Sequence, residues 1–326
     1  MAYLSLYRKY RPRTFEEILG QEAVTRTLAN AVVEDRVAHA YLFTGPRGTG
    51  KTSTARILAK ALNCAQGPTP DPCNKCESCL AIAEGSSLDL IEMDAASHSK
   101  VDETREILAG VPLATAGGRR KVYVIDEVHM LSTGSFNALL KTLEEPPGHV
   151  LFVLATTEAH KVLPTIVSRT QRFDFRRLTA DVLQKHLAGV AEAEGIDVET
   201  QALEVIARHA DGSARDALSV LDQVSSFAGS VDAEQVERLL GERREDALVA
   251  LFDAVAGGDV GGVFEVVQAF VGRGADVRQL ALACLEHARS LLLLKSSPGA
   301  GDLLDTSLED RPRLAEQAGR FGGAHL

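Results

Sequence analysis

The chain has 326 residues, enough for two or three domains, and its 45% hydrophobic and 25% charged residues are typical of a globular protein. It contains no apolar run near the ~20 residues that span a membrane, and Met1–Arg13 lack the apolar core of a signal peptide, so we expect a cytoplasmic protein without membrane contacts. A net charge of −10 excludes a surface covered with basic residues for nucleic acid, although it is compatible with a local basic patch.

The first distinctive segment is basic. Residues 7–15 carry four positive charges, and Pro12 excludes a continuous helix through them. Such a segment suits contact with a nucleotide base or with phosphate, and a solvated basic arm is the alternative. The next stretch, residues 21–34, has Val24 and Leu28 on one face and therefore predicts an amphipathic helix.

A phosphate-binding motif follows. Between a predicted buried strand at 40–44 and a predicted helix at 53–62, the chain reads Gly-Pro-Arg-Gly-Thr-Gly-Lys-Thr, which matches G-x-x-x-x-G-K-[ST] at every defined position. Inward-pointing N–H groups and the helix dipole would make this loop an anion site, and a glycine-rich turn is the alternative. We expect Lys51 to reach the β- and γ-phosphates and the Thr52 hydroxyl to hold Mg²⁺. The rest of the loop would bind the nucleotide through Gly45, Pro46, Arg47, Gly48, Thr49 and Gly50.

Four of the five cysteines lie close together, at Cys64, Cys73, Cys76 and Cys79. Disulfides are disfavoured in a chain without an export signal, and four thiolates within 16 residues suit tetrahedral Zn²⁺. We therefore expect a zinc site, with reduced cysteines that hold no metal as the alternative. The fifth, Cys284, lies in an apolar helical run and is expected to be a buried hydrophobic residue.

A second motif ends the predicted strand that starts at Lys121, where an apolar run closes with two carboxylates, Asp126 and Glu127. An acidic residue at a strand end beside a phosphate loop commonly holds the metal, and the next carboxylate can activate a water for attack on the γ-phosphate. We expect Asp126 to bind Mg²⁺ and Glu127 to be the general base; a pair of surface acids is the alternative. His129 is expected to pack nearby rather than to bind a ligand.

A fourth buried strand is predicted at 150–157, and it ends in two hydroxyl residues. A hydroxyl at that end suits a sensor of the γ-phosphate or of the attacking water. Farther along, Arg169 follows a short helix and precedes a predicted strand at 171–175. Strands that alternate with helices predict an α/β fold with a mostly parallel sheet covered on both faces.

Only helices are predicted after Arg177, so the chain divides into three expected domains, at 1–178, 179–242 and 243–326. A further helix is expected to begin at Phe321–Leu326. The third domain would then be incomplete, and the chain by itself would assemble poorly.

Together these features resemble the AAA+ ATPases and, more narrowly, the gamma/tau family of bacterial DNA polymerase III, whose members are motors of the clamp loader. The narrow resemblance rests on the basic opening, the four-cysteine insertion, Gly20–Glu22, His39–Phe43, Asp94–Ser97, Asp126–Leu131 and Asn137–Pro147. It implies an AAA+ core with a parallel sheet and a zinc module, followed by a helical lid domain and a helical collar domain.

The resemblance assigns roles that the residues alone leave open. It places Arg169 in the family's Ser-Arg-Cys motif, as an arginine finger that acts on a neighbouring subunit's ATP; here Thr170 replaces the cysteine. It makes Thr157 the first sensor and Arg215 the second sensor of the γ-phosphate. It also gives the zinc site a structural role and implies an adenine pocket lined by Tyr7, Arg11 and Pro12.

The implied activity is ATP hydrolysis that opens a sliding clamp and loads it onto primed DNA during replication, with ATP, Mg²⁺ and structural Zn²⁺ as cofactors. The implied partners are copies of this chain, subunits of the delta and delta-prime type, the sliding clamp, and primer-template DNA bound through its phosphates. One alternative is a different AAA+ DNA-remodelling ATPase, such as a helicase motor or an initiator, which should lack the zinc module and the collar. The other is a scaffold with an inactive site, against which the intact Lys51, Asp126, Glu127 and Arg169 argue.

Overall fold

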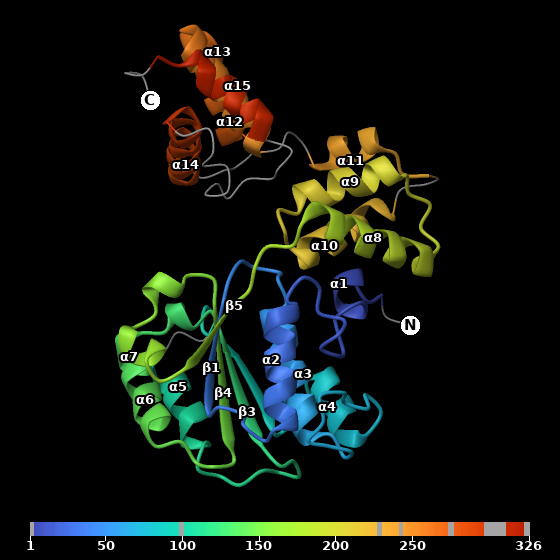
Figure 1. Ribbon diagram of the computed structural model, residues 1–326, viewed down its shortest axis with the longest axis vertical. Helices are drawn as coiled ribbons and strands as arrows, with labels where there is room; N and C mark the ends of the chain where they lie inside the picture. Colours follow the sequence, from blue (N-terminus) through green and yellow to red (C-terminus); the bar gives the residue numbers. More distant parts are fainter. Residues whose placement is uncertain are drawn as a thin grey trace. The chain divides into compact units, whose positions relative to one another are not determined.

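The computed structural model describes residues 3–97, 101–226, 230–240, 244–272, 277–296 and 311–322. The chain forms two compact units, Met1–Val236 and Glu237–Leu326, whose elements are drawn in Figure 1. In the described part of the chain, every helix is too short or too polar to cross a membrane.

A five-stranded parallel sheet forms the centre of the first unit, which confirms the predicted fold class. The strand order is β2-β3-β4-β1-β5. The strands are β1 (Ala40–Thr44), β2 (Leu90–Asp94), β3 (Lys121–Asp126), β4 (Val150–Thr156) and β5 (Gln171–Asp174). Thr44 pairs with Thr156 and Asp94 with Asp126. The carboxyl ends of the strands therefore meet along one edge of the sheet, where ligands bind in open α/β sheets.

Helices cover both faces of this sheet (Figure 1). One face carries α2 (Glu22–Val33), α3 (Lys51–Asn63) and α4 (Glu77–Glu84); the other carries α5 (Val101–Ala109), α6 (Thr133–Glu144) and α7 (Pro164–Val167). Because side chains alternate along a strand, Tyr41 and Phe43 enter the first core with Leu58, whereas Leu42 enters the second with Leu139. These five side chains are fully buried, and each such burial stabilises the fold by about 1.5–3 kcal/mol.

The rest of the first unit is mostly helical, with an isolated parallel bridge between Val198 and Val231. It comprises the short α1 (Leu6–Lys9) and the helices α8 (Ala180–Glu194), α9 (Thr200–His209), α10 (Ala214–Val224) and α11 (Ala233–Leu240), the last of which crosses the boundary between the units. Thr179 and Ser213 cap α8 and α10 by accepting from the backbone N–H of Val182 and Asp216. Two further short 3₁₀ helices, η1 (Val128–Met130) and η2 (Ala159–Lys161), follow β3 and β4.

The second unit contains α12 (Arg244–Gly257), α13 (Val260–Gly272), α14 (Val277–Ser296) and α15 (Arg311–Arg320). Its interior includes a polar pair, because Gln317 is 2% exposed and its Oε1 lies 2.7 Å from the His287 Nε2. The Gln317 amide donates to the Val249 carbonyl at 2.7 Å, so it ties three helices together. Cys284 packs against the apolar cluster of Leu248 but is half-buried rather than fully buried as we predicted.

In the described part of the chain, α1, α4 and α15 are helices that were not predicted. α15 ends before Phe321, and residues 323–326, where a further helix is expected to begin, lie outside the described part of the chain. Pro312, at the second position of α15, is a typical helix-start signal that would have located it. The helices predicted at 21–34 and 53–62 and the strands predicted at 40–44, 150–157 and 171–175 agree with α2, α3, β1, β4 and β5 to within two residues at each end.

Two buried side chains hold the loop that leads into β3. The Asp89 carboxylate, 7% exposed, accepts from the backbone N–H groups of Ala116, Gly117 and Gly118 at 2.7, 3.1 and 2.6 Å. At the end of α3, the Asn63 Oδ1 accepts from the N–H groups of residues 119 and 120 at 2.8 and 2.9 Å. The start of the strand that carries Asp126 is therefore fixed to the helix that follows the phosphate loop.

We predict that Asp89→Ala destabilises the fold by about 2–3 kcal/mol, because it leaves three N–H groups without their acceptor. That loss corresponds to a fall of about 5–10 °C in the midpoint of thermal unfolding, measured by differential scanning calorimetry. The control is Glu34→Ala, whose carboxylate pairs with Arg36 at the surface and should shift the midpoint by about 1 °C or less. Equal midpoints for the two variants would contradict the assigned role of Asp89.

Candidate functional site

The phosphate loop joins β1 to α3 and needs its glycines for two reasons. Gly45, Gly48 and Gly50 have φ angles of 141°, 75° and 101°, which other residues rarely adopt. A Cβ on Gly45 would lie 2.3 Å from the Phe175 carbonyl oxygen, and one on Gly48 would lie 1.9 Å from the Ser213 Oγ. The loop is thus enclosed by the end of β5 and by the start of α10.

Lys51 lies inside this loop. Its side chain is 6% exposed, and the Nζ donates to the carbonyl oxygens of Gly45 and Pro46, at 2.7 Å each. Burial lowers the pKa of Lys51, while the nearby Asp126 and Glu127 carboxylates act in the opposite direction. The ammonium group is therefore held where it would meet a phosphate entering the loop.

The two predicted magnesium ligands are in contact. The Thr52 hydroxyl donates to the Asp126 Oδ2 at 2.7 Å, and the second oxygen, Oδ1, accepts from the Glu127 N–H at 2.9 Å. A hydroxyl and a carboxylate are hard oxygen donors of the kind that Mg²⁺ prefers, and Mg²⁺ usually takes only one or two protein ligands beside substrate phosphates. The residues present therefore fit a magnesium ion bound together with nucleotide phosphates.

The predicted general base and the predicted first sensor are also in contact. Glu127 has φ 47° and ψ 46°, a left-handed conformation that costs a non-glycine residue about 1–3 kcal/mol. Its Oε2 accepts from the backbone N–H of Thr157 at 3.1 Å and from the Thr157 hydroxyl at 2.9 Å. Thr156, one residue earlier, is fully buried and binds the His129 ring instead.

The N-terminal segment lies against α8 and α10. The Arg215 guanidinium is 5.0 Å from the centre of the Tyr7 ring, and Tyr10 and Lys9 both bond to Glu194 at the end of α8. These contacts join two predicted binding residues, Tyr7 and Arg215, to each other.

Arg11 and Pro12 follow α1 in the same segment, and both are half-buried. Burial lowers the pKa of Arg11; the nearby Arg56 and Arg215 act in the same direction, and Glu92 and Asp126 oppose them. Arg11 therefore lies within electrostatic range of the predicted magnesium carboxylate. The adenine pocket itself stays a prediction.

Arg169 is not brought to the phosphate loop of its own chain. Its guanidinium forms an ion pair with Glu144 at 2.9 Å and donates to the Thr165 carbonyl oxygen at 2.8 Å. Its side chain is 35% exposed. An arginine held at the end of α6 and partly open to solvent is available to a second molecule, and its role as a finger stays a prediction.

The four-cysteine module is compact enough for a metal. The sulfur atoms of Cys64, Cys73, Cys76 and Cys79 all lie within 4.8 Å of one another, against about 3.8 Å expected around a tetrahedral ion with bonds of about 2.3 Å. The N–H groups of Lys75 and Cys76 lower the pKa of Cys73 to about 6, which favours a thiolate, whereas burial raises the pKa of Cys79. The chemistry of this donor set fits a structural metal.

Sequence reasoning missed several residues of the site, all of which act over long sequence separations. Ser213 touches Gly48, and the N–H of Ala214 donates to the Gly48 carbonyl oxygen at 3.1 Å. Glu144 and Glu194 hold Arg169 and Tyr10. The Gly-Ser pair before α10 is a helix-start signal, but nothing local to it indicates contact with the phosphate loop.

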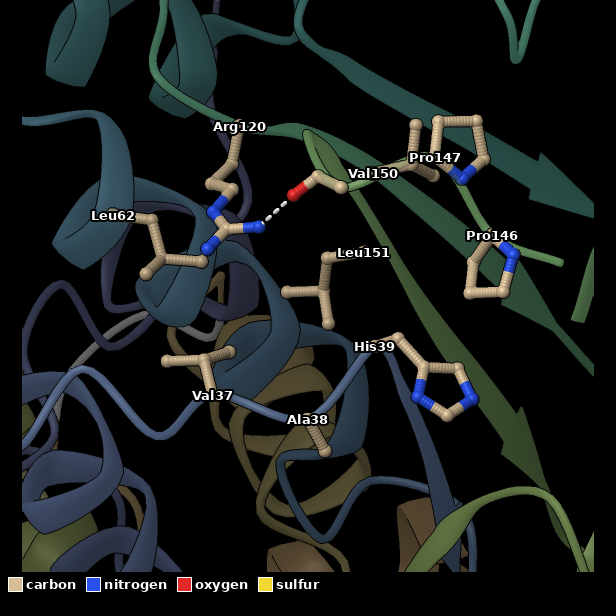
Figure 2. A pocket seen from close by; sticks show the side chains of 10 residues that line it. Val37, Ala38, His39, Leu62, Arg120, Pro146, Pro147, Val150 and Leu151 are labelled. Atoms are coloured by element: carbon tan, nitrogen blue, oxygen red, sulfur yellow. Dashed lines mark hydrogen bonds between the residues drawn. The ribbon is translucent and has the colours of Figure 1, made fainter.

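A small cavity lies at the opposite edge of the sheet, where β1 and β4 begin (Figure 2). Its volume is about 80 Å³, and it is lined mainly by apolar side chains such as Val37, Leu62 and Leu151. Arg120 closes one side by donating to the Gly148 carbonyl oxygen, as the dashed line in Figure 2 marks. The cavity is separate from the site described above.

Family models match three consecutive segments of the chain. Residues 20–179 match the model described as DNA polymerase III, delta subunit. Residues 182–230 match the DNA polymerase III clamp loader subunit, ATPase lid domain, and residues 231–326 match DNA polymerase III subunits gamma and tau domain III.

Curated relatives agree with these models. The chain is 46% identical over 320 residues to DNA polymerase III subunit tau of Bacillus subtilis, covering 97% of this chain and 57% of that protein. It is 45% identical over 331 residues to subunit gamma/tau of Mycobacterium tuberculosis, covering 99% and 57%, and 45% identical over 301 residues to subunit tau of Escherichia coli, covering 92% and 47%. The chain thus spans about half the length of the curated relatives it matches.

Among solved structures, the Thermotoga maritima RuvB Holliday junction branch migration motor is similar, with a TM-score of 0.55 and 20% sequence identity. The match covers 81% of this chain and 91% of that one. At this identity the likeness shows a shared fold, and the curated relatives carry the narrower assignment.

We predict that Gly48→Ala lowers the affinity for a nucleoside triphosphate by at least about tenfold, because the added Cβ collides with Ser213 and the φ of 75° is strained. Titration with a fluorescent ATP analogue measures this affinity. Gly189→Ala is the matched control, since Gly189 lies inside α8 with nothing within 4 Å of an added Cβ. The control should keep full affinity and gain up to about 1 kcal/mol of stability. Unchanged affinity in Gly48→Ala would refute the assigned geometry.

Proposed function

Because the chain belongs to the gamma/tau family of DNA polymerase III subunits, which are AAA+ ATPases, we propose that it is an ATP-driven motor subunit of the replicative clamp loader, working in the cytoplasm. One observation carries the proposal: Lys51, the Thr52–Asp126 pair and the Glu127–Thr157 pair gather at the carboxyl edge of the sheet. Together they supply what phosphoryl transfer to water requires, namely positioning and charge stabilisation.

Each residue of that group has a proposed role in hydrolysis. Lys51 leaves the loop carbonyls for the β- and γ-phosphates, and Thr52 and Asp126 hold Mg²⁺, which would neutralise charge on the phosphate oxygens. Glu127 orients a water molecule and accepts its proton, while Thr157 places the carboxylate and senses the γ-phosphate. Arg215 turns from Tyr7 to the γ-phosphate, and Tyr7, Arg11 and Pro12 surround the adenine.

Assembly supplies the remaining part of the site. We place Arg169 in the ATP site of a neighbouring subunit, which makes hydrolysis depend on a correctly formed ring of copies of this chain and subunits of the delta and delta-prime type. With ATP bound, the ring would open the sliding clamp, accept primer-template DNA through its phosphates, and close the clamp after hydrolysis. An AAA+ helicase motor is the second candidate, favoured only by the fold-level likeness to RuvB.

Zn²⁺ is the proposed occupant of the cysteine module, with a structural role. Four thiolates complete a tetrahedral shell and leave no open position for catalysis. The module begins at Cys64, directly after α3, so the ion would fix the end of the helix that starts at Lys51. We also propose that the chain is divided into three domains, at 1–178, 179–242 and 243–326. The third of these would be the helical collar.

We predict that Cys79→Ser loses the zinc, from about one ion per chain to below about 0.1, as measured by elemental mass spectrometry after purification without chelators. The matched control is Cys284→Ser, which lies outside the module and should keep the metal. Purified wild-type chain that holds no zinc, or Cys79→Ser that holds as much as the control, would contradict a zinc site.

The decisive prediction concerns Arg169→Ala. In an assembly of the chain, extended past residue 326, with delta-type subunits, sliding clamp and primed DNA, wild-type turnover should rise when clamp and DNA are added. Arg169→Ala should lower that stimulated turnover by about 10³-fold without changing ATP affinity, since arginine fingers act on the transition state. Arg172→Ala, on β5, is a control expected to keep stimulation. Turnover that ignores clamp and primed DNA would assign the chain to another AAA+ machine.

A further inference from the structure

His129 lies beside the catalytic group and has no role in the proposal above. It belongs to η1, which begins directly after the left-handed residue Glu127, and this turn brings the His129 ring back against the end of β4. The side chain is only 5% exposed. A buried imidazole at this place has fixed hydrogen-bond partners, and those partners indicate what it does.

The ring binds both neighbours of Thr157 in the sequence. Its Nδ1 lies 2.8 Å from the Thr156 Oγ1, and its Nε2 lies 2.9 Å from the Glu158 Oε2. Thr157 lies between them, and its N–H and its hydroxyl both donate to the Glu127 Oε2. Fixing the residues on either side fixes the position and direction of these two donors.

Of the two neutral tautomers of the ring, only the one with its hydrogen on Nε2 satisfies all of these contacts. The Glu158 N–H donates to the Thr156 Oγ1 at 3.0 Å, so the hydroxyl has its own hydrogen left to donate to Nδ1. The hydrogen on Nε2 then goes to the Glu158 carboxylate, which also accepts from Lys161 at 2.8 Å. The Glu127 Oε2 is 3.4 Å from Nδ1, too far for a good hydrogen bond to the ring, so the carboxylate depends on Thr157.

We propose that His129 is a positioning residue for hydrolysis: through Thr156 and Glu158 it holds Thr157, and thereby the carboxylate of Glu127, in place. The proposal rests on the proposed function of Glu127 as the general base. The ring's hydrogen-bond partners are Thr156 and Glu158, whereas Lys51 bonds to the carbonyls of the phosphate loop, so His129 acts on the hydrolytic step and not on ATP binding.

The first test removes the hydrogen bonds of the His129 ring and keeps a flat ring in the same place. In the assembled complex, His129→Phe should lower kcat about 10- to 100-fold, the effect of a misplacement of about 1 Å, and leave the affinity for ATP within about twofold. His129→Gln, whose amide reaches the Nε2 position, and His129→Asn, which reaches the Nδ1 position, should each recover part of the loss. A kcat of His129→Phe equal to that of the wild type would overturn the proposal, as would loss of ATP affinity in proportion to kcat.

A double-mutant cycle with Glu127→Gln separates this proposal from the proposed function. If His129 acts through Glu127, His129→Phe causes no further loss of kcat once Glu127 is replaced. A full additional loss in the double variant would refute positioning while leaving Glu127 as the base. Wild-type turnover by Glu127→Gln alone would refute the proposed base itself, and the role of His129 with it.

The tautomer gives a readout that does not depend on turnover. Nitrogen-15 NMR of the imidazole side chains should show His129 with its hydrogen on Nε2, the signal being assigned by its absence from the His129→Gln spectrum. Thr156→Val should change that signal, since it removes the donor to Nδ1. A ring with its hydrogen on Nδ1, or a signal unchanged in Thr156→Val, would contradict the arrangement.

Discussion

The parallel register of β1, β3 and β4 is the constraint on which the whole site depends. Thr44 is paired with Thr156, and Ile125 is paired with Leu154, so the three strands end within two residues of one another. The phosphate loop, the carboxylates and the threonine pair each follow one of these strands. A shift of one residue in the ladder would turn the other face of a strand to the site, because side chains alternate along a strand.

The sheet supplies only half of the site, and helices packed at its edge supply the rest. Ser213 and Ala214, at the start of α10, close the phosphate loop at Gly48. The N-terminal α1 lies against the same helix and brings Tyr7 to Arg215. These contacts join segments about 160–210 residues apart in the sequence, so they exist only once the first unit has folded.

This difference explains what the sequence could and could not predict. The phosphate loop, the two carboxylates at the end of β3 and the cysteine cluster are short motifs that can be recognised from neighbouring residues alone. The pattern of apolar residues then places these motifs at strand ends and helix starts. The partners of Arg169 and His129 were not predictable, because Glu144 and Glu158 look like ordinary surface acids. The Asp89 carboxylate is a similar case, since its three acceptor bonds need a loop that begins 27 residues later.

The contact between Gly48 and the start of α10 has a consequence for how the protein handles its nucleotide. The start of α10 forms one wall of the phosphate loop. Any rotation of α10 therefore changes the shape of the loop and the position of Arg215 together. The shape of the phosphate loop and the orientation of α10 are therefore coupled. A load applied to α10 from outside, far from any phosphate, would therefore reach the wall of the phosphate loop.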